Sequence, residues 1–181
     1  LHQADNNKKN KHTMPITIPA GYEYVLISTL GISFQIILQG FGIGKLRRSL
    51  FGAEFFKTNF PKLDAKQYQG GYPDMGNGRF AEKLSFEDWT KFNNYQRAHY
   101  NYVEGGASAL ALLLVSGLFF PNAAAITGGA YILGRAAFAW GYRSAGPKAR
   151  LPGALVLDAA LVTWLGLASY GLFQYISANR A

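Results

Sequence analysis

Long apolar stretches dominate the sequence, and one long polar segment interrupts them. Four stretches, at residues 22–44, 100–120, 123–142 and 153–176, have about 20 residues each, the length with which a helix crosses the hydrocarbon core of a bilayer. Helices of a soluble bundle would carry a polar outer stripe, which these stretches largely lack. Because lipid offers no hydrogen bonds to an open backbone, we expect each stretch to be a membrane-spanning helix. The pattern predicts an all-α, integral membrane four-helix bundle over residues 19–181, preceded by a polar extension at 1–18.

The polar segment between the first two stretches, residues 45–96, is also rich in aromatic side chains. This content is too high for a fully disordered loop, so we expect the segment to fold over one mouth of the bundle. Within it, YPDMGNG at 72–78 indicates a turn, and SFEDW at 85–89 indicates a short helix with Ser85 as its N-cap.

Positive charge gathers at one end of the predicted bundle. The chain has 18 Lys and Arg against 10 Asp and Glu, a net charge of +8. The segments that join the first span to the second and the third to the fourth hold Lys45, Arg47, Arg48, Lys57, Lys62, Lys66, Arg79, Lys83, Lys91, Arg143, Lys148 and Arg150. The opposite side holds only Lys8, Lys9, Lys11 and Arg180. The positive-inside rule therefore places both basic segments in the cytoplasm.

The charge also limits the partners and the chemistry that we expect. Acidic residues are interleaved through 54–88 and no stacking or groove-reading motif is present, so we expect no nucleic-acid partner but contact with membrane lipids. The chain has no Cys, which excludes a disulfide framework, a thiolate zinc site and a cysteine nucleophile. We expect no metal, and any sulfur chemistry would use the sulfur of a ligand.

Ionisable residues inside the spans are the candidates for function, because a charge at mid-bilayer costs at least about 2.5–3.5 kcal/mol on insertion scales. Arg97, Asn101, Glu104 and Ser108 are spaced so that they share one face of the second span. A cation, an amide and an anion in one stripe suit a zwitterionic, hydrogen-bonding ligand, although Arg97 could instead only snorkel to the interface. We expect Arg135 and Asp158, in the third and fourth spans, to form a structural intramembrane pair.

Three segments resemble one family of membrane proteins. RAHYNYVE at 97–104 is similar to the R-A-H/Q-x-N-x-x-E signature of the MAPEG superfamily, the membrane-associated proteins of eicosanoid and glutathione metabolism. GRAAFAWGYRSAGPKARLPGAL at 134–155 and PAGYEYVLISTL at 19–30 resemble its microsomal glutathione transferases of the third type. The similarity covers roughly residues 19–48 and 93–173, with all four spans in order.

This resemblance implies a homotrimer that binds glutathione between neighbouring subunits, near the cytoplasmic face. The residues that it assigns to glutathione binding are Arg97, His99, Asn101, Glu104, Tyr142 and Arg47. It assigns catalytic roles to Arg150, which would stabilise the glutathione thiolate, and to Arg48, which would handle the lipid substrate. Taken alone, Tyr142 could equally belong to an interfacial aromatic belt.

The implied activity is that of a membrane-bound glutathione transferase and peroxidase, with glutathione as cosubstrate. Its acceptors would be lipophilic electrophiles or lipid hydroperoxides. Phe138 stands where several relatives have Tyr, Gly105 stands where leukotriene C synthase has Tyr, and the loop between Arg48 and Arg97 is longer than in that enzyme. Because of these departures, we do not expect specific leukotriene synthesis.

A second interpretation stays open at this point. The long aromatic loop and the polar amino terminus also suit a non-catalytic, accessory or structural subunit of a larger organellar membrane complex. For either function, we expect a multi-pass protein of the endoplasmic reticulum or of an organelle membrane, mitochondrial or plastid.

Overall fold

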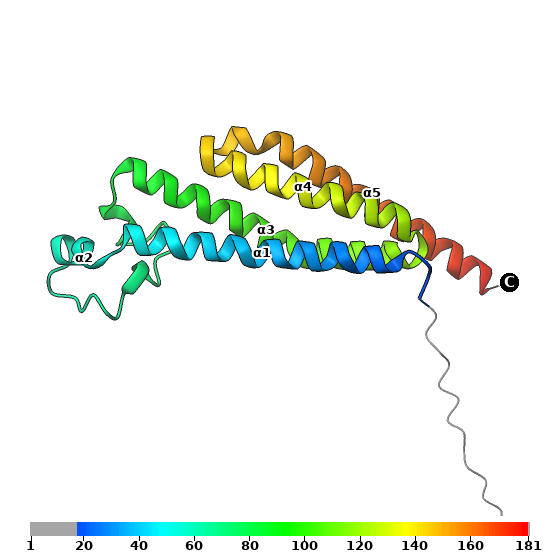
Figure 1. Cartoon of the computed structure of the whole chain (residues 1–181), viewed down its shortest axis with the longest axis horizontal. Coiled ribbons are helices and arrows are strands. Elements are labelled where there is room, and N and C mark those ends of the chain that lie inside the picture. The colour runs from blue at the N-terminus through cyan, green and yellow to red at the C-terminus, as the bar shows by residue number, and fades with distance from the viewer. Residues whose placement is uncertain (1–17, 181) are drawn as a thin grey trace, which may run out of the picture.

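The fold is an all-helical bundle built from four long helices (Figure 1). The computed structural model describes residues 18–180. The long helices are α1 (Tyr22–Leu50), α3 (Phe86–Phe119), α4 (Pro121–Ala145) and α5 (Leu151–Ala178). Three of the predicted spans lie wholly inside α1, α4 or α5, and the span 100–120 lies in α3 except for its last residue, Phe120. No strand occurs within residues 18–180. Apart from Ile18, the predicted polar extension lies outside the described residues.

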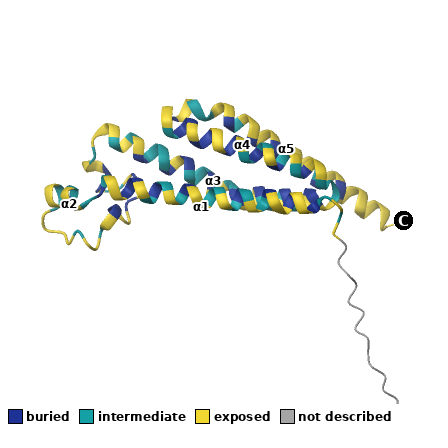
Figure 2. Cartoon of the chain, in the orientation of Figure 1, coloured by how far each residue is buried: buried dark blue, intermediate teal, exposed yellow. Residues whose placement is uncertain are grey.

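Three helical segments are long and apolar enough to cross a membrane: α1, α3 and residues 147–178, which contain α5. The remaining long helix, α4, is not among these three segments; its sequence carries Arg135 and many small residues. All four long helices turn exposed residues outwards (Figure 2). Large apolar side chains among them include Phe41, Leu133 and Trp140, each more than 70% exposed. Such an apolar exterior is suited to contact with lipid.

The helices at the basic end are longer than the predicted spans. α1 continues to Leu50, and α3 begins at Phe86, so the predicted loop 45–96 is shorter than expected. Ser85 caps α3 by accepting a hydrogen bond from the Asp88 backbone N–H at 3.1 Å. The predicted short helix is therefore the first turn of α3. Polar residues mark the end of an apolar stretch but do not end the helix. At the basic end, α1 and α3 therefore project beyond α4 and α5 (Figure 1).

Residues 51–85, which we call the loop lobe, fold over the projecting ends of α1 and α3 (Figure 1). The lobe contains α2 (Ala53–Asn59) and two short 3-10 helices, η1 (Gln69–Gly71) and η2 (Ala81–Lys83). Its aromatic core consists of Phe51, Phe56 and Phe80, which pack with Leu46 of α1 and Phe92 of α3. The rings meet edge to face, for example Phe56 and Phe80 with centroids 5.1 Å apart. The expectation of an ordered aromatic loop is confirmed.

Asp74 organises the predicted turn at 72–78. Its Oδ1 accepts hydrogen bonds from the backbone N–H groups of Gly76 at 2.8 Å and Gly78 at 3.0 Å, and its Oδ2 accepts one from Ala81 at 2.7 Å. Burial by itself raises the pKa of Asp74, but the backbone N–H groups outweigh burial and hold the pKa below its usual value. Asp74 therefore stays ionised, with its charge spread over the turn.

α4 and α5 pack very closely because glycines lie between their backbones. A Cβ atom added to Gly153 of α5 would collide with the backbone nitrogen of Phe138 in α4. A Cβ added to Gly166, further along α5, would have nothing within 4 Å. Small residues allow helices to approach in lipid, where van der Waals contact drives association.

We expect Gly153→Ala to destabilise the bundle by about 1–3 kcal/mol, because the added methyl group overpacks the α4–α5 contact. Gly166→Ala is the matched control and should leave stability unchanged or slightly raised, since Ala favours the helix. Thermal unfolding of each variant in detergent, followed by circular dichroism, measures the difference. Equal midpoints for the two variants would contradict the close α4–α5 packing.

Candidate functional site

The predicted polar stripe of α3 lies on the face that points away from the rest of the bundle. Arg97, Glu104 and Ser108 are exposed, and Asn101 is half-buried. The opposite face of α3, with residues such as Tyr102, is buried against α1 and α4. The stripe is thus accessible, and any ligand on it would be open on one side unless another chain covered it.

Arg135 of α4 reaches this stripe from inside the bundle. It is 3% exposed, and its Nη1 donates a hydrogen bond to Asn101 Oδ1 at 2.6 Å. Its Nε donates to the Tyr131 hydroxyl at 2.9 Å, and the guanidinium lies over the Tyr102 ring at 4.6 Å from the centroid. Because the amide oxygen faces Arg135, the NH2 group of Asn101 remains as the donor on the stripe.

The predicted pairing of Arg135 with Asp158 needs correction. Within residues 18–180, Arg135 makes its polar contacts with Asn101 and Tyr131, and Asp158 is exposed on α5. The sequence spacing within each helix could not show that Tyr131, Asn101 and Tyr102 would surround the Arg135 guanidinium. A Cβ on Gly105 would come within 3.1 Å of Arg135 Nη2, so the glycine that departs from leukotriene C synthase makes room for this arginine.

Arg150 lies where the short connection between α4 and α5 returns to the bundle. It ends η3 (Pro147–Arg150), and its guanidinium lies over the rings of Phe138 and Tyr142, at 5.6 and 5.3 Å from their centroids. Tyr142 is 7% exposed and Arg150 is half-buried. The structure therefore brings Arg150 and Tyr142 together. Phe138, which has no hydroxyl group, contacts the Arg150 guanidinium through the face of its ring.

His99 occupies a different face of α3 from the stripe. Its ring approaches Gly40 of α1, and its Nδ1 is buried with no hydrogen-bond partner within the described chain. Within the chain, the body of α3 therefore separates the His99 ring from the side chains of Arg97 and Glu104.

The two arginines at the end of α1 have contrasting surroundings. Arg47 is 1% exposed; its Nε donates to Gly70 O at 2.9 Å and its Nη2 to Asp74 O at 2.6 Å. It also lies over the Tyr72 ring at 3.8 Å from the centroid. Contrary to its predicted place among the glutathione ligands, Arg47 fastens the loop lobe. The reason is that the lobe folds back onto α1 and surrounds this side chain.

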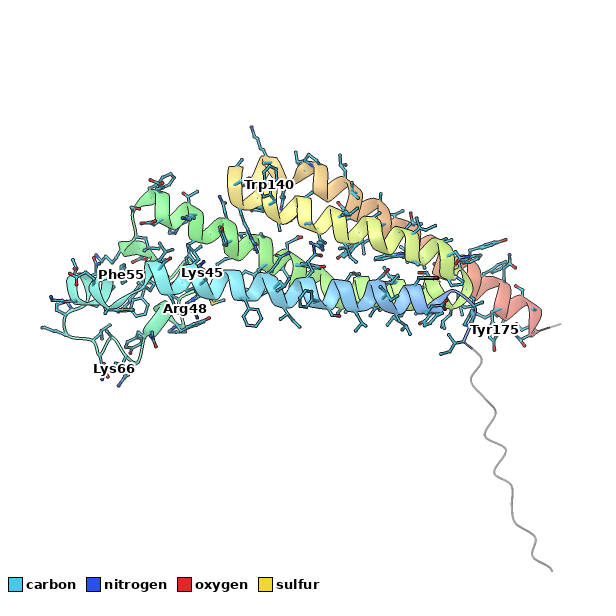
Figure 3. All side chains as sticks on the ribbon, viewed as in Figure 1. Lys45, Arg48, Phe55, Lys66, Trp140 and Tyr175 are labelled. Atoms are coloured by element: carbon cyan, nitrogen blue, oxygen red, sulfur yellow. The ribbon has the colours of Figure 1, made fainter. Side chains whose placement is uncertain are left out.

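Arg48, next in the chain, is exposed and lies at the end of α1 beside the loop lobe (Figure 3). It borders a hollow of about 220 Å³ together with Lys66 and Phe51. Arg48 is therefore accessible to a ligand at the membrane surface, which is compatible with the role that the resemblance gives it.

Sequence reasoning missed several polar residues between α1, α3 and α4. The Tyr102 hydroxyl donates to Gln35 Oε1 at 2.7 Å, and Arg143 Nη2 donates to Gln39 Oε1 at 3.3 Å. Gln35 and Gln39 are four residues apart on one face of α1, and that spacing in an apolar span was the available signal. Within residues 18–180, no group of three or more His, Asp or Glu side chains could hold a metal ion.

A comparison with models of protein families matches residues 25–170, from the first turn of α1 to Tyr170 of α5, to the MAPEG family. The chain belongs to the MAPEG family. The match includes all four long helices, the α3 stripe and Arg150. MAPEG proteins include membrane glutathione transferases and peroxidases as well as eicosanoid enzymes, and they use glutathione as a substrate. Together with the apolar helices, MAPEG membership makes the chain an integral membrane protein. The resemblance is thus confirmed at the level of the family.

Proposed function

We propose that this MAPEG protein is a membrane glutathione transferase with glutathione-dependent peroxidase activity, of the third microsomal type. The observation that carries the proposal is the open α3 stripe of Arg97, Asn101 and Glu104 in a family that uses glutathione. The glutathione tripeptide has two carboxylates and one ammonium group. An arginine fork suits a carboxylate, Glu104 suits the ammonium group, and the Asn101 NH2 group can donate to a carbonyl.

A second subunit would complete this site. Because Arg97 and Glu104 are exposed on a single chain, a tripeptide bound to them would have water or lipid on its other side. A homotrimer that packs α3 against its neighbour closes the stripe and excludes water, which strengthens each ionic contact. The mass of the detergent-solubilised particle distinguishes a trimer from a single copy.

Arg150 is the candidate for activating the glutathione sulfur. A thiol with a pKa of about 8.5 is mostly protonated at neutral pH, and a guanidinium close to the sulfur favours the thiolate. The rings of Phe138 and Tyr142 hold Arg150 at the basic end of α4. From there it can contact the ligand without competing for the buried Arg135 contacts.

The thiolate then reacts with an acceptor that enters from the bilayer. In conjugation, sulfur forms a bond to an electrophilic carbon and the displaced electron pair leaves with a leaving group or takes up a proton. In peroxide reduction, sulfur attacks the terminal hydroperoxide oxygen and the O–O bond breaks. This leaves glutathione sulfenic acid and a lipid alkoxide, which takes up a proton to become the alcohol. The thiol of a second glutathione then attacks the sulfenic sulfur, which forms glutathione disulfide and releases the sulfenic oxygen as water.

We place the protein in the endoplasmic reticulum or an outer organelle membrane, with the loop lobe and Arg150 on the cytoplasmic side. The charge distribution supports this orientation, since the basic residues of the loop lobe and η3 lie at one end of the bundle.

Binding of glutathione to the purified full-length protein tests the proposal. We expect saturable binding by calorimetry, and Glu104→Gln should weaken it about tenfold, which corresponds to about 1.4 kcal/mol. Glu23→Gln is the matched control, because Glu23 is exposed at the first turn of α1, and it should bind like the wild type. Absence of binding to the wild-type protein would overturn the proposal and favour the non-catalytic accessory subunit.

A further inference from the structure

The loop lobe contains a hollow that is separate from the α3 stripe. Its volume is about 830 Å³, and it is lined by residues 59–63, 68, 73–75 and 77–80. Ligand pockets in proteins measure roughly 300–1,000 Å³ and are mostly apolar. The walls of the hollow include the rings of Phe60, Tyr68 and Phe80 and the side chains of Leu63 and Met75. The hollow is therefore mostly apolar, as ligand pockets usually are.

Fixed contacts hold the walls of this hollow. The Phe80 ring meets the Phe60 ring with centroids 5.1 Å apart and the Tyr68 ring at 5.4 Å. On the other side, the three backbone hydrogen bonds of Asp74 fix the turn at 74–81, and Arg47 ties Asp74 O to α1 at 2.6 Å. The hollow is thus a formed feature of the lobe, which lowers the cost of ordering it around a ligand.

The charged groups at the hollow favour an anion. Lys62 and Arg79 line it and are both exposed. Asp74 is the acidic residue among its lining residues, and both of its carboxylate oxygens accept hydrogen bonds from backbone N–H groups. An open apolar hollow with two accessible cations, in a lobe at the basic end of the bundle, is complementary to an amphiphile with a negative head and one apolar chain.

We propose that the hollow of the loop lobe binds a long-chain fatty acid, with the chain against Phe60, Leu63 and Phe80 and the carboxylate between Lys62 and Arg79. A single acyl chain suits a hollow of about 830 Å³, whereas a lipid with two chains and a large head does not. The site is distinct from the α3 stripe and does not depend on glutathione chemistry. It gives the long loop a binding function of its own.

Binding of palmitate to the full-length protein in neutral-lipid nanodiscs tests the proposal. The Lys62→Gln/Arg79→Gln variant removes both cations that line the hollow. The matched control, Lys57→Gln/Lys83→Gln, removes two exposed cations of the same lobe that do not line it. We expect the first variant to bind palmitate at least tenfold more weakly and the control to stay within twofold of the wild type. Palmitate methyl ester, which has no charge, should bind all three proteins alike.

A second measurement locates the ligand, because the chain has no Cys and accepts a single reporter thiol. Palmitate should slow the reaction of Leu63→Cys with a maleimide and leave the reaction of Lys57→Cys unchanged. Neither glutathione nor Glu104→Gln should alter palmitate binding, so this proposal can fail or succeed independently of the first. Equal loss of binding in both double variants, or no protection of Leu63→Cys, would overturn it. Crosslinking of Leu63→Cys between two chains, insensitive to palmitate, would show instead that another copy covers the hollow.

Discussion

Replacing Arg150 by alanine is expected to lower the rate of glutathione conjugation by about a hundredfold or more at neutral pH, the scale of losing one preorganised electrostatic group. The guanidinium rests on Phe138 and Tyr142, and under the proposed function it faces the glutathione sulfur. Without it, the pKa of the bound thiol should return towards about 8.5, at a cost of about 1.4 kcal/mol for each pKa unit. Thiolate absorbance in the ultraviolet and turnover of a lipophilic electrophile measure the two effects.

Lys148→Ala is the matched control, since Lys148 is an exposed cation of the same short helix η3. It should leave both the thiolate absorbance and the rate near the wild-type values. The conjugation rate of the Arg150→Ala variant should recover as the pH rises towards the pKa of free glutathione, because the glutathione thiol is then deprotonated without the guanidinium. An unchanged thiolate signal in Arg150→Ala would remove Arg150 from the mechanism.

Replacing Arg47 by alanine should unfold the loop lobe while leaving the helical bundle intact. The change deletes the hydrogen bonds to Gly70 O and Asp74 O and the contact with the Tyr72 ring. Hydrogen bonds from charged donors contribute about 1.5–3 kcal/mol each, and the carbonyls left behind are buried. A local loss of about 3 kcal/mol is therefore expected. It should be seen as rapid proteolysis within residues 51–85, while the four long helices stay protected.

Arg48→Ala separates this effect from a general loss of charge, because Arg48 adjoins Arg47 but is exposed. It should leave the proteolysis of the lobe unchanged. Arg47→Lys should give an intermediate rate, since one ammonium group cannot reproduce the fork that spans two carbonyls. If Arg47→Ala weakened glutathione binding while the lobe stayed protected, the earlier assignment of Arg47 to the glutathione site would be restored.

The helices could be predicted from the sequence because an apolar stretch of membrane length has few other stable conformations. Their ends could not, because polarity marks the edge of the bilayer and not the end of a helix. The Ser85 cap was the local signal that placed the start of α3 correctly. The full length of α3 was not predicted, because the polar residues after Phe86 were assigned to the loop.

The site was predicted in part for a similar reason. Spacing alone placed Arg97, Glu104 and Ser108 on one face of α3, since helical periodicity determines it. The surroundings of Arg135 and Arg47 depend on segments that are distant in sequence. Asn101 of α3 contacts Arg135, and Gly70 of the loop lobe contacts Arg47. No pattern within one helix reports such contacts.

The contact between Arg135 and Asn101 has a consequence for biosynthesis. α4 is not among the helices that are apolar enough to cross a membrane on their own, and it holds a guanidinium that is costly in lipid. Its amide partner lies on α3, which a single residue, Phe120, separates from α4. α4 therefore gains its stability in the bilayer from a helix that the ribosome has already made. Insertion of α3 and α4 as a hairpin follows from this arrangement, and α5 joins a pair that is already assembled.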